Sequence, residues 1–424
     1  MKRLTLRRGF SWTLVGNAVY AACQWGALVV IARFTTPESV GTFALALAVV
    51  TPIFILANLQ LRALQATDAL SEHPASSYVW LRLGTSTVAI LTVAAVTWLA
   101  GFSEASRHVI WIITAAKTVE SISDVLYGRF QQLERMDWVS RSLMLRGVSM
   151  LVFVFAAAAY SGQLIPATVA IAASNLLVLI LHDAVVVQRI DVPRHRLGTH
   201  SLAILPSLIG LMRAGLPLGL AMMISSANSS LPRILIERMI GERELGVFAA
   251  IAYFVVAGGT LVSALGQASS PRLSQYLSRS DVGSARQLLA RLMLIAAMIG
   301  GLGVALAASA GPLILSTTYG DEYAAGNALF VWIMVYGAVT YVASILGFGM
   351  TAARVFLPQL PIAVSAVVVT GVMCVILIPR YGATGAALAL LASAVVRAVY
   401  SWYVNHSALA RKDNGSRPSR QAHS

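Results

Sequence analysis

The sequence predicts an all-α polytopic membrane protein: about twelve transmembrane helices in two pseudo-symmetric six-helix lobes around a central cavity. The first observation behind this prediction is composition. Of the 424 residues 58% are hydrophobic and only 11% are charged, and the mean hydropathy is +0.76. Soluble domains carry about 25% charged residues. The composition therefore excludes a soluble protein.

The second observation is an internal repeat. A first set of matches has an offset of 205 residues, and a second, offset by 221, pairs Trp111 with Trp332 and Gly128 with Gly349. Duplication inside a very hydrophobic chain is typical of a membrane transporter built from two bundles, with the substrate path between them. The first set consists of Ile31, Arg33, Val40, Gly41, Phe43 and Ala44, which recur as Ile236, Arg238, Leu245, Gly246, Phe248 and Ala249.

The spans follow from apolar runs long enough to cross a bilayer, which takes about 20 residues. The run Gly147 to His182 is too long for one helix, and Ser161-Gly162-Gln163 with Pro166 supplies a turn within it. We predict twelve spans, at about 10–32, 40–61, 80–101, 107–127, 142–161, 166–187, 214–236, 245–268, 292–314, 325–349, 355–378 and 383–404.

The distribution of Lys and Arg predicts the orientation. If the N-terminus is cytoplasmic, the inside segments hold 23 of the 31 basic residues and the outside loops hold six. Cytoplasmic loops are enriched in Lys and Arg, so both termini are predicted to be cytoplasmic. The net charge of +14 then reflects this topology, and no nucleic-acid partner is expected.

Four segments are predicted along the chain. Residues 1–187 form the N-terminal six-helix lobe and residues 214–405 the C-terminal one. Between them lies a basic cytoplasmic linker, 188–213, whose apolar stretch Leu202 to Met212 is too short to span and is expected to lie along the membrane surface. The polar and basic residues 406–424 are expected to form a disordered cytoplasmic tail.

Three motifs carry a family resemblance. The stretch from Ala32 to Phe43, the stretch from Pro312 to Ala324 and the stretch from Ile378 to Ala387 occur in the order, and at the helix junctions, found in Wzx-type polysaccharide flippases. The chain resembles this family, part of the multidrug/oligosaccharidyl-lipid/polysaccharide exporter superfamily. In one departure, Pro232 stands where many relatives have an acidic residue before the arginine that ends helix seven, here Arg233.

The resemblance implies export of oligosaccharides carried on a polyprenyl pyrophosphate for cell-surface polysaccharide synthesis, such as O-antigen or exopolysaccharide. It implies a multi-pass protein of the bacterial cytoplasmic membrane that moves its substrate between leaflets by alternating access. The partners expected are the lipid-linked oligosaccharide, membrane lipids, a polysaccharide polymerase and glycosyltransferases.

A charged stripe occupies the fourth predicted span. Lys117, Glu120 and Asp124 are spaced i, i+3 and i+7, which puts them on one helical face. Each ionised group at the bilayer centre costs about 2.5 to 3.5 kcal/mol, so the stripe is predicted to face the bundle interior or water. It either lines a substrate cavity or forms an internal ion pair, Lys117 with Glu120, that only helps helices pack.

Single cations and softer polar groups complete the candidate binding residues. Arg33 and Arg238 occupy matching positions in the repeat, so their guanidinium groups are expected at the same depth in the membrane, where they could bind a pyrophosphate. Alternatively, they anchor the helices at the membrane surface or pair with Glu38 and Glu237. Arg397, alone in the last span, either faces the cavity or snorkels to the cytoplasmic side. Asn17, Gln24 and Asn228 suit sugar hydroxyls, or hydrogen bonds between helices.

Other function classes have weaker support. The chain has no GxxxxGK[ST] phosphate loop, so ATP use is not expected, and its scattered histidines predict no metal site or cofactor. A glycosyltransferase or polymerase would place catalytic groups on long external loops, so the chain is predicted not to be an enzyme. The leading alternative is a cation-coupled drug antiporter of the same superfamily, which the membrane carboxylates Glu120 and Asp124 would suit. A third possible function is export of lipid II.

Overall fold

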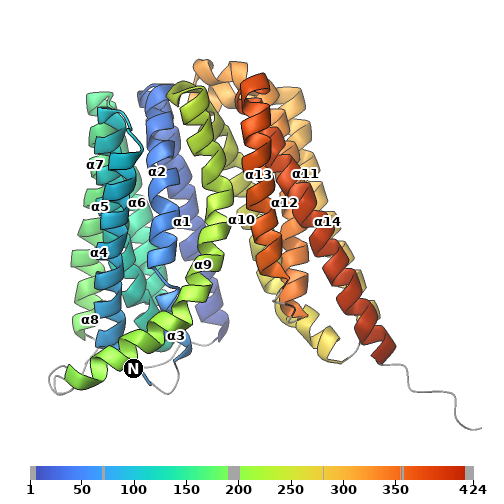
Figure 1. Ribbon diagram of the computed structural model, residues 1–424. Coiled ribbons are helices and arrows are strands. Elements are labelled where there is room, and N and C mark those ends of the chain that lie inside the picture. Colours follow the sequence, from blue (N-terminus) through green and yellow to red (C-terminus); the bar gives the residue numbers. More distant parts are fainter. Residues whose placement is uncertain are drawn as a thin grey trace, which may run out of the picture. The chain divides into compact units, whose positions relative to one another are not determined.

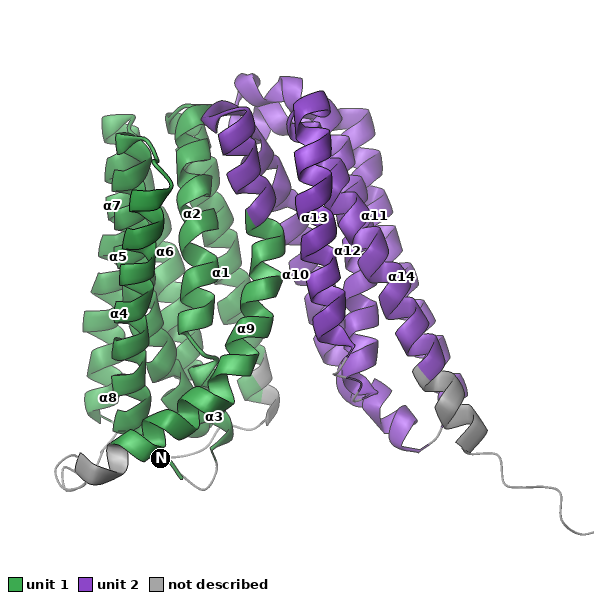
Figure 2. Ribbon diagram, in the orientation of Figure 1, with its two compact units in different colours: residues 1–230 green, residues 231–424 purple. Residues whose placement is uncertain are grey.

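The computed structural model is entirely helical over the residues it describes, which are 6–68, 72–189, 201–279, 281–353, 355 and 358–415 (Figure 1). These residues form two compact units, Met1–Ser230 and Leu231–Ser424, coloured separately in Figure 2. The predicted linker between 190 and 200, and the predicted tail from 416 on, lie outside the described residues.

Unit 1 contains six membrane-length helices and shorter elements that connect or extend them. The helix α9 begins in unit 1 and crosses its boundary. The elements are α1 (Leu6–Phe34), α2 (Pro37–Ala57), α3 (Leu61–Thr67), α4 (Ala75–Leu99), α5 (Glu104–Gln132), α6 (Met136–Ser161), α7 (Leu164–Val178) continued by the π-helical turn η1 (Leu179–Ala184) and α8 (Val185–Arg189), and α9 (Ser201–Met239).

Unit 2 is built from five further long helices and the end of α9. In α11 the backbone leaves helical geometry at Ala310, two residues before Pro312, whose ring cannot donate a backbone hydrogen bond. The elements are α10 (Glu242–Ser278), α11 (Val282–Tyr319), the 3₁₀ turn η3 (Asp321–Gly326), α12 (Asn327–Ala352), α13 (Gln359–Tyr381) and α14 (Ala383–Gly415).

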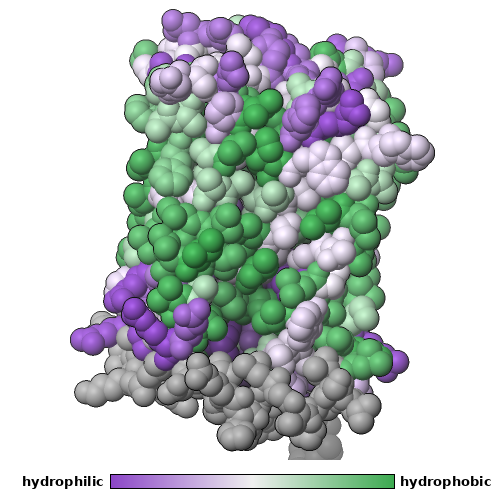
Figure 3. Space-filling view, turned by 90° about the vertical axis from the view of Figure 1, so that its left-hand side faces the viewer, coloured by the Kyte–Doolittle hydropathy of each residue, from purple (hydrophilic) through white to green (hydrophobic). Residues whose placement is uncertain are grey.

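Every predicted span coincides with a long helix, so the fold class is confirmed. Eleven helices are long and apolar enough to cross a membrane, and the twelfth, α5, is 29 residues long but carries the charged stripe. The predicted turn after Ser161 is also present, with Gly162 in the left-handed conformation at φ 64°. On the face of unit 1 seen in Figure 3, a hydrophobic band separates two hydrophilic ends, as a bilayer requires.

The structure differs from the sequence prediction at two helix ends. Leu202 to Met212 is part of α9, continuous with the seventh span. Its Leu211 is buried against Leu59 and Tyr78, so tertiary packing at the lower end of unit 1 extends a helix that hydropathy alone would end. The last helix, α14, continues to Gly415 and takes in the first ten residues assigned to the tail.

Close packing of α1 on α6 sets the position of the polar residues of α1. A Cβ added at Gly16 would lie 2.8 Å from the backbone Cα of Ser140, and one added at Gly147 would lie 3.2 Å from the Cα of Tyr20. Small residues allow two membrane helices to approach this closely. The contact holds Asn17 and Tyr20 beside α6.

We predict that Gly16→Ala destabilises the protein by about 1 to 3 kcal/mol, because the added methyl group meets backbone that cannot move aside. The measurement is the midpoint of thermal unfolding of the purified protein in detergent. Gly84→Ala is the matched control, since nothing lies within 4 Å of the added Cβ in α4. Equal midpoints for the two variants would contradict the packing described.

Candidate functional site: a charged cavity in unit 1

A cavity of about 360 Å³ lies inside unit 1, and most of its polar wall comes from α5. We call it the α5 cavity. Five elements or their ends contribute to it: α1, α2, α3, α5 and α6. Its lining consists of Asn17, Tyr20, Thr51, Phe54, Ile55, Asn58, Arg62, Lys117, Glu120, Ser121, Asp124, Tyr127, Leu143 and Arg146.

The charged stripe of α5 lines this cavity, and two of its members form an ion pair. Lys117 Nζ lies 2.8 Å from Glu120 Oε2, one helical turn away. The side chains are 23% and 35% exposed, respectively. The ion pair that the sequence analysis considered is therefore present, and both of its members line the cavity. A role of the pair in substrate binding stays a prediction.

Asp124 joins two arginines from other elements. Its two carboxylate oxygens lie 3.5 Å from an Arg62 nitrogen and 3.1 Å from an Arg82 nitrogen. Arg82, on α4, is only 1% exposed and also donates a hydrogen bond to Asn58 Oδ1. Ser121 donates to the same oxygen at 2.9 Å. Asp124 therefore supplies the counter-charge that allows Arg82 to be buried.

A strained turn brings Asn58 and Arg62 to this site. Leu59 and Gln60 have φ of 47° and 50°, a conformation that non-glycine residues rarely adopt. The turn separates α2 from α3, so Arg62 comes back toward α5, where its Nε donates to Gln131 at 3.2 Å. Strain of this kind persists where the surrounding contacts fix it, often at functional sites.

A second charge pair, almost fully buried, adjoins the cavity, and its arginine is one of the lining residues. Arg146 of α6 and Asp183 of η1 are 1% and 0% exposed, with 3.5 Å between their charged atoms. Arg146 also donates to Ser123 at 2.6 Å, and its guanidinium carbon lies 5.8 Å from the centre of the Tyr127 ring. Its Nε atom, like that of Arg82, is buried without a partner among the described residues. Buried groups left unpaired are uncommon and merit a functional explanation.

Exposure divides these charges into two layers. Lys117, Glu120, Asp124 and Arg62 are 23 to 35% exposed, so a ligand in the cavity can reach them. Arg82 and Asp183 are shut away and fix the positions of the others. Three cations and two carboxylates line the cavity, which leaves one net positive charge. Such a wall can hold an anion and can hydrogen-bond hydroxyl groups.

The other candidate residues of the sequence do not all meet here. Asn17 lines the cavity and donates to its own helix at Thr13 O, 2.8 Å away. The remaining candidates are described by the structure but are not lining residues of the α5 cavity: Gln24, half-buried on α1; Arg33, exposed at the end of α1; Asn228, half-buried on α9; Arg238, exposed and 3.5 Å from Glu237; and Arg397, half-buried on α14.

Sequence reasoning missed the arginines of this site. It counted Arg62, Arg82 and Arg146 among the basic residues at the cytoplasmic ends of the helices and gave none of them a place in a site, whereas Arg82 and Arg146 are buried. Both residues lie near the start of a predicted span, 80–101 or 142–161, where hydropathy does not distinguish a buried arginine from one at the membrane surface. A usable signal was present: acids in a span require cations nearby.

We predict that Asp124→Asn destabilises the protein by about 3 kcal/mol, because it leaves Arg82 buried without its counter-charge. Removing both charges, in the double variant Arg82→Gln with Asp124→Asn, should restore part of that loss. Thermal unfolding midpoints and membrane abundance measure the effect. Asp321→Asn, at an exposed position of η3, is the control. An Asp124→Asn variant as stable as this control would show that the pair is not needed.

A family model and a curated relative identify the sequence. The model described as polysaccharide biosynthesis protein matches residues 6–277. The capsular polysaccharide biosynthesis protein CapF of Staphylococcus aureus is 24% identical over 397 residues, which is 93% of this chain and 98% of CapF.

Solved structures identify the fold. An inward-facing multidrug resistance transporter of the MATE family, MOP superfamily, matches with a TM-score of 0.77 at 13% identity, over 96% of this chain and all of the other. The lipid II flippase MurJ, in an inward closed conformation, matches with a TM-score of 0.71 at 13% identity, over 95% and 90%. Both of these solved structures are of transport proteins, and their fold is the one predicted from the sequence. The chain belongs to the polysaccharide biosynthesis protein family and has the fold of MOP-superfamily transporters.

Proposed function

We propose that this protein is a flippase that moves polyprenyl-pyrophosphate-linked oligosaccharide units from the cytoplasmic to the external leaflet of a bacterial cytoplasmic membrane. The observation that carries the proposal is a partly exposed, net cationic cavity in a protein of a polysaccharide biosynthesis family with a transporter fold. A substrate of this class has an anionic pyrophosphate and many hydroxyl groups, and it needs a polar route through the membrane.

In this proposal the α5 cavity binds the polar part of the substrate. Lys117 and Arg62, both partly exposed, attract the pyrophosphate. Asn17, Thr51 and Asn58 offer hydrogen bonds to sugar hydroxyls. The carboxylates of Glu120 and Asp124 offset part of the positive charge, so the anion is held weakly enough to leave. The polyprenyl tail stays in lipid throughout.

A membrane potential would favour this transport. With the inside negative, outward movement of an anion is favoured by about 2.3 kcal/mol per charge for each 100 mV. The two charges of a pyrophosphate would double this figure. No ATP site is required.

The second candidate, a cation-coupled drug antiporter, is favoured by the MATE fold and by the two carboxylates in the cavity. An antiporter uses an acid that can gain and lose a proton or sodium ion. Here Glu120 is paired with Lys117, and Asp124 with Arg62 and Arg82. Each acid is thus already engaged with a cation, and neither is the lone carboxylate that such an ion switch needs, which favours the flippase.

The cations outside the cavity have proposed roles of their own. Arg33 and Arg238 belong to different units and remain our proposed outer contacts for the pyrophosphate, while Arg397 is proposed to face the substrate path from α14. Glycosyltransferases supply the substrate in this scheme, and a polysaccharide polymerase consumes it.

We predict that the double variant Lys117→Gln with Glu120→Gln reduces transport about tenfold, since a charged hydrogen bond to the pyrophosphate is lost while the cavity stays neutral at that point. The assay follows a short-chain pyrophosphate-linked disaccharide in proteoliposomes with an imposed potential. Lys117→Arg should keep part of the activity. Arg286→Gln, at an exposed position of α11, should keep all of it.

Two outcomes of this assay would count against the proposal. Full transport by a well-folded double variant would remove Lys117 from the binding site. Efflux of a cationic dye driven by a proton gradient, with no movement of the disaccharide, would support the antiporter instead.

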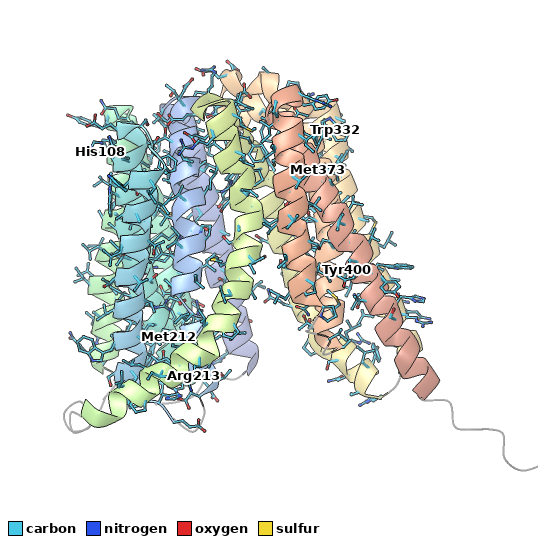
Figure 4. All side chains as sticks on the ribbon, viewed as in Figure 1. His108, Met212, Arg213, Trp332, Met373 and Tyr400 are labelled. Atoms are coloured by element: carbon cyan, nitrogen blue, oxygen red, sulfur yellow. The ribbon has the colours of Figure 1, made fainter. Side chains whose placement is uncertain are left out.

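We also predict that both termini are cytoplasmic, from the bias of 23 basic residues inside to six outside. Reporter fusions after residue 70, 198 or 281 should read cytoplasmic, and fusions near 104, 163, 242 or 321 external. Figure 4 labels His108 and Arg213 at opposite ends of unit 1, which this orientation makes external and cytoplasmic. A cytoplasmic signal at 321 would contradict it.

A further inference from the structure

A second cavity, of about 510 Å³, lies on the side of unit 1 between the first turns of α6 and the α7–α8 segment. We call it the α6–α8 groove. It is lined by Trp138, Arg141, Met144, Leu145, His182, Val186 and Arg189. None of these residues lines the α5 cavity, whose α6 contacts are Leu143 and Arg146. The groove therefore lies on a different face of α6 from the α5 cavity.

One end of the groove is cationic. Arg141 and Arg189 are both exposed, and they come from the start of α6 and the last residue of α8. The Arg141 guanidinium lies 5.4 Å from the centre of the Trp12 ring. The nearest acid in sequence, Asp137, is already held by two hydrogen bonds from Arg135, at 2.9 and 2.8 Å. Asp137 also interacts electrostatically with Arg141, but one carboxylate cannot neutralise both Arg135 and Arg141, so this end of the groove stays cationic.

A buried acid positions His182 in the same groove. Its Nδ1 lies 2.9 Å from Asp183, which is 0% exposed and also paired with Arg146. Nδ1 is therefore occupied, and Nε2 is the ring nitrogen that a ligand can use. Both residues belong to the π-helical turn η1. Such turns are rare within α-helices and are frequent at functional sites.

The other end of the groove is apolar. Met144, Leu145 and Val186 line it, and Leu145 and the neighbouring Leu181 are 50% and 65% exposed. Trp138, one turn before Arg141 on α6, also lines the groove, and aromatic side chains of this kind are enriched at the level of lipid headgroups. Figure 3 shows hydrophilic residues below the hydrophobic band on the face it presents. The groove thus joins a phosphate-binding end to a lipid-facing end.

We infer that the α6–α8 groove binds an anionic phospholipid of the cytoplasmic leaflet. The lipid phosphate contacts Arg141, Arg189 and His182 Nε2, since guanidinium groups match phosphate oxygens. One acyl chain covers Met144, Leu145 and Val186. Basic pockets between membrane helices on the cytoplasmic side bind such headgroups. The assignment of the lipid to the cytoplasmic leaflet rests on the orientation proposed above, whereas the chemistry of the groove does not depend on it.

The geometry favours a phospholipid over two other anions. A soluble phosphate would leave the apolar end and the exposed Leu145 uncovered. The pyrophosphate carrier of the proposed function has to enter the α5 cavity, and the groove shares no lining residue with it. A resident lipid would instead hold η1, and with it Asp183 and Arg146, in place behind the transport cavity.

The test uses the purified full-length protein in a neutral detergent, titrated with phosphatidylglycerol or phosphatidylcholine, with the thermal unfolding midpoint as readout. Phosphatidylglycerol should raise the midpoint and phosphatidylcholine should not. The double variant Arg141→Gln with Arg189→Gln should bind phosphatidylglycerol about 30-fold more weakly, from the loss of two interfacial arginines. The double variant with Lys at both positions should keep most of the binding.

Matched controls separate this site from general charge effects. Arg107→Gln with Arg380→Gln removes two exposed arginines elsewhere and should leave the titration unchanged. The inference would be overturned if this control lost as much phosphatidylglycerol binding as the groove variant. It would also be overturned if phosphatidylcholine raised the unfolding midpoint as much as phosphatidylglycerol does, or if soluble glycerol phosphate gave the full rise. Displacement of phosphatidylglycerol by polyprenyl pyrophosphate at equal concentration would assign the groove to the carrier instead. Failed transport with intact phosphatidylglycerol binding would count against the proposed function alone.

Discussion

The cost of a charge inside a membrane governs the architecture of unit 1. Arg82, Arg146 and Asp183 are at most 1% exposed, and none could be buried alone. Each is met by a partner from another element: Arg82 by Asp124 across α4 and α5, and Arg146 by Asp183 across α6 and η1. Because a lone buried ion is far more costly than a pair, these contacts fix the helices in register. The cavity is the space that these pairs enclose.

The sequence repeat shows how this cluster relates to the fold. The offset of 221 aligns α5 with α12, and it places Ala338, Tyr341 and Ile345 opposite Lys117, Glu120 and Asp124. In unit 2 the hydroxyl of Tyr341 donates to the backbone of Val255 at 2.9 Å, so a neutral contact stands where unit 1 has an ion pair. Duplication accounts for the shared helix order. At these three positions only unit 1 carries charged residues, so the charged stripe of the α5 cavity has no counterpart there in unit 2.

Much of the fold was predictable from the sequence because hydropathy and helix length report directly on the bilayer. All twelve spans could be found this way, and α5 was found despite its charges because apolar residues surround them. Two features could not be predicted from the sequence. The start of α9 depends on the burial of Leu211 against Leu59 and Tyr78, a tertiary contact that no local pattern encodes. The partners of Arg82 and Arg146 are Asp124 and Asp183, acids that are distant in sequence.

The site, too, was predictable where it follows from a local sequence pattern and not where it depends on tertiary contacts. The stripe of Lys117, Glu120 and Asp124 was visible as a helical spacing, but its partners were not, since an arginine at the end of an apolar run is equally consistent with a cytoplasmic loop. Three-dimensional pairing removes that ambiguity. It also explains why the partly exposed charges are tolerated: Lys117 and Arg62 each lie beside a carboxylate that offsets their positive charge. In the flippase proposed above, an anion that enters the cavity could draw on these cations, and its departure would leave each of them still paired with a carboxylate. This is the electrostatic condition that binding and release of the pyrophosphate would require.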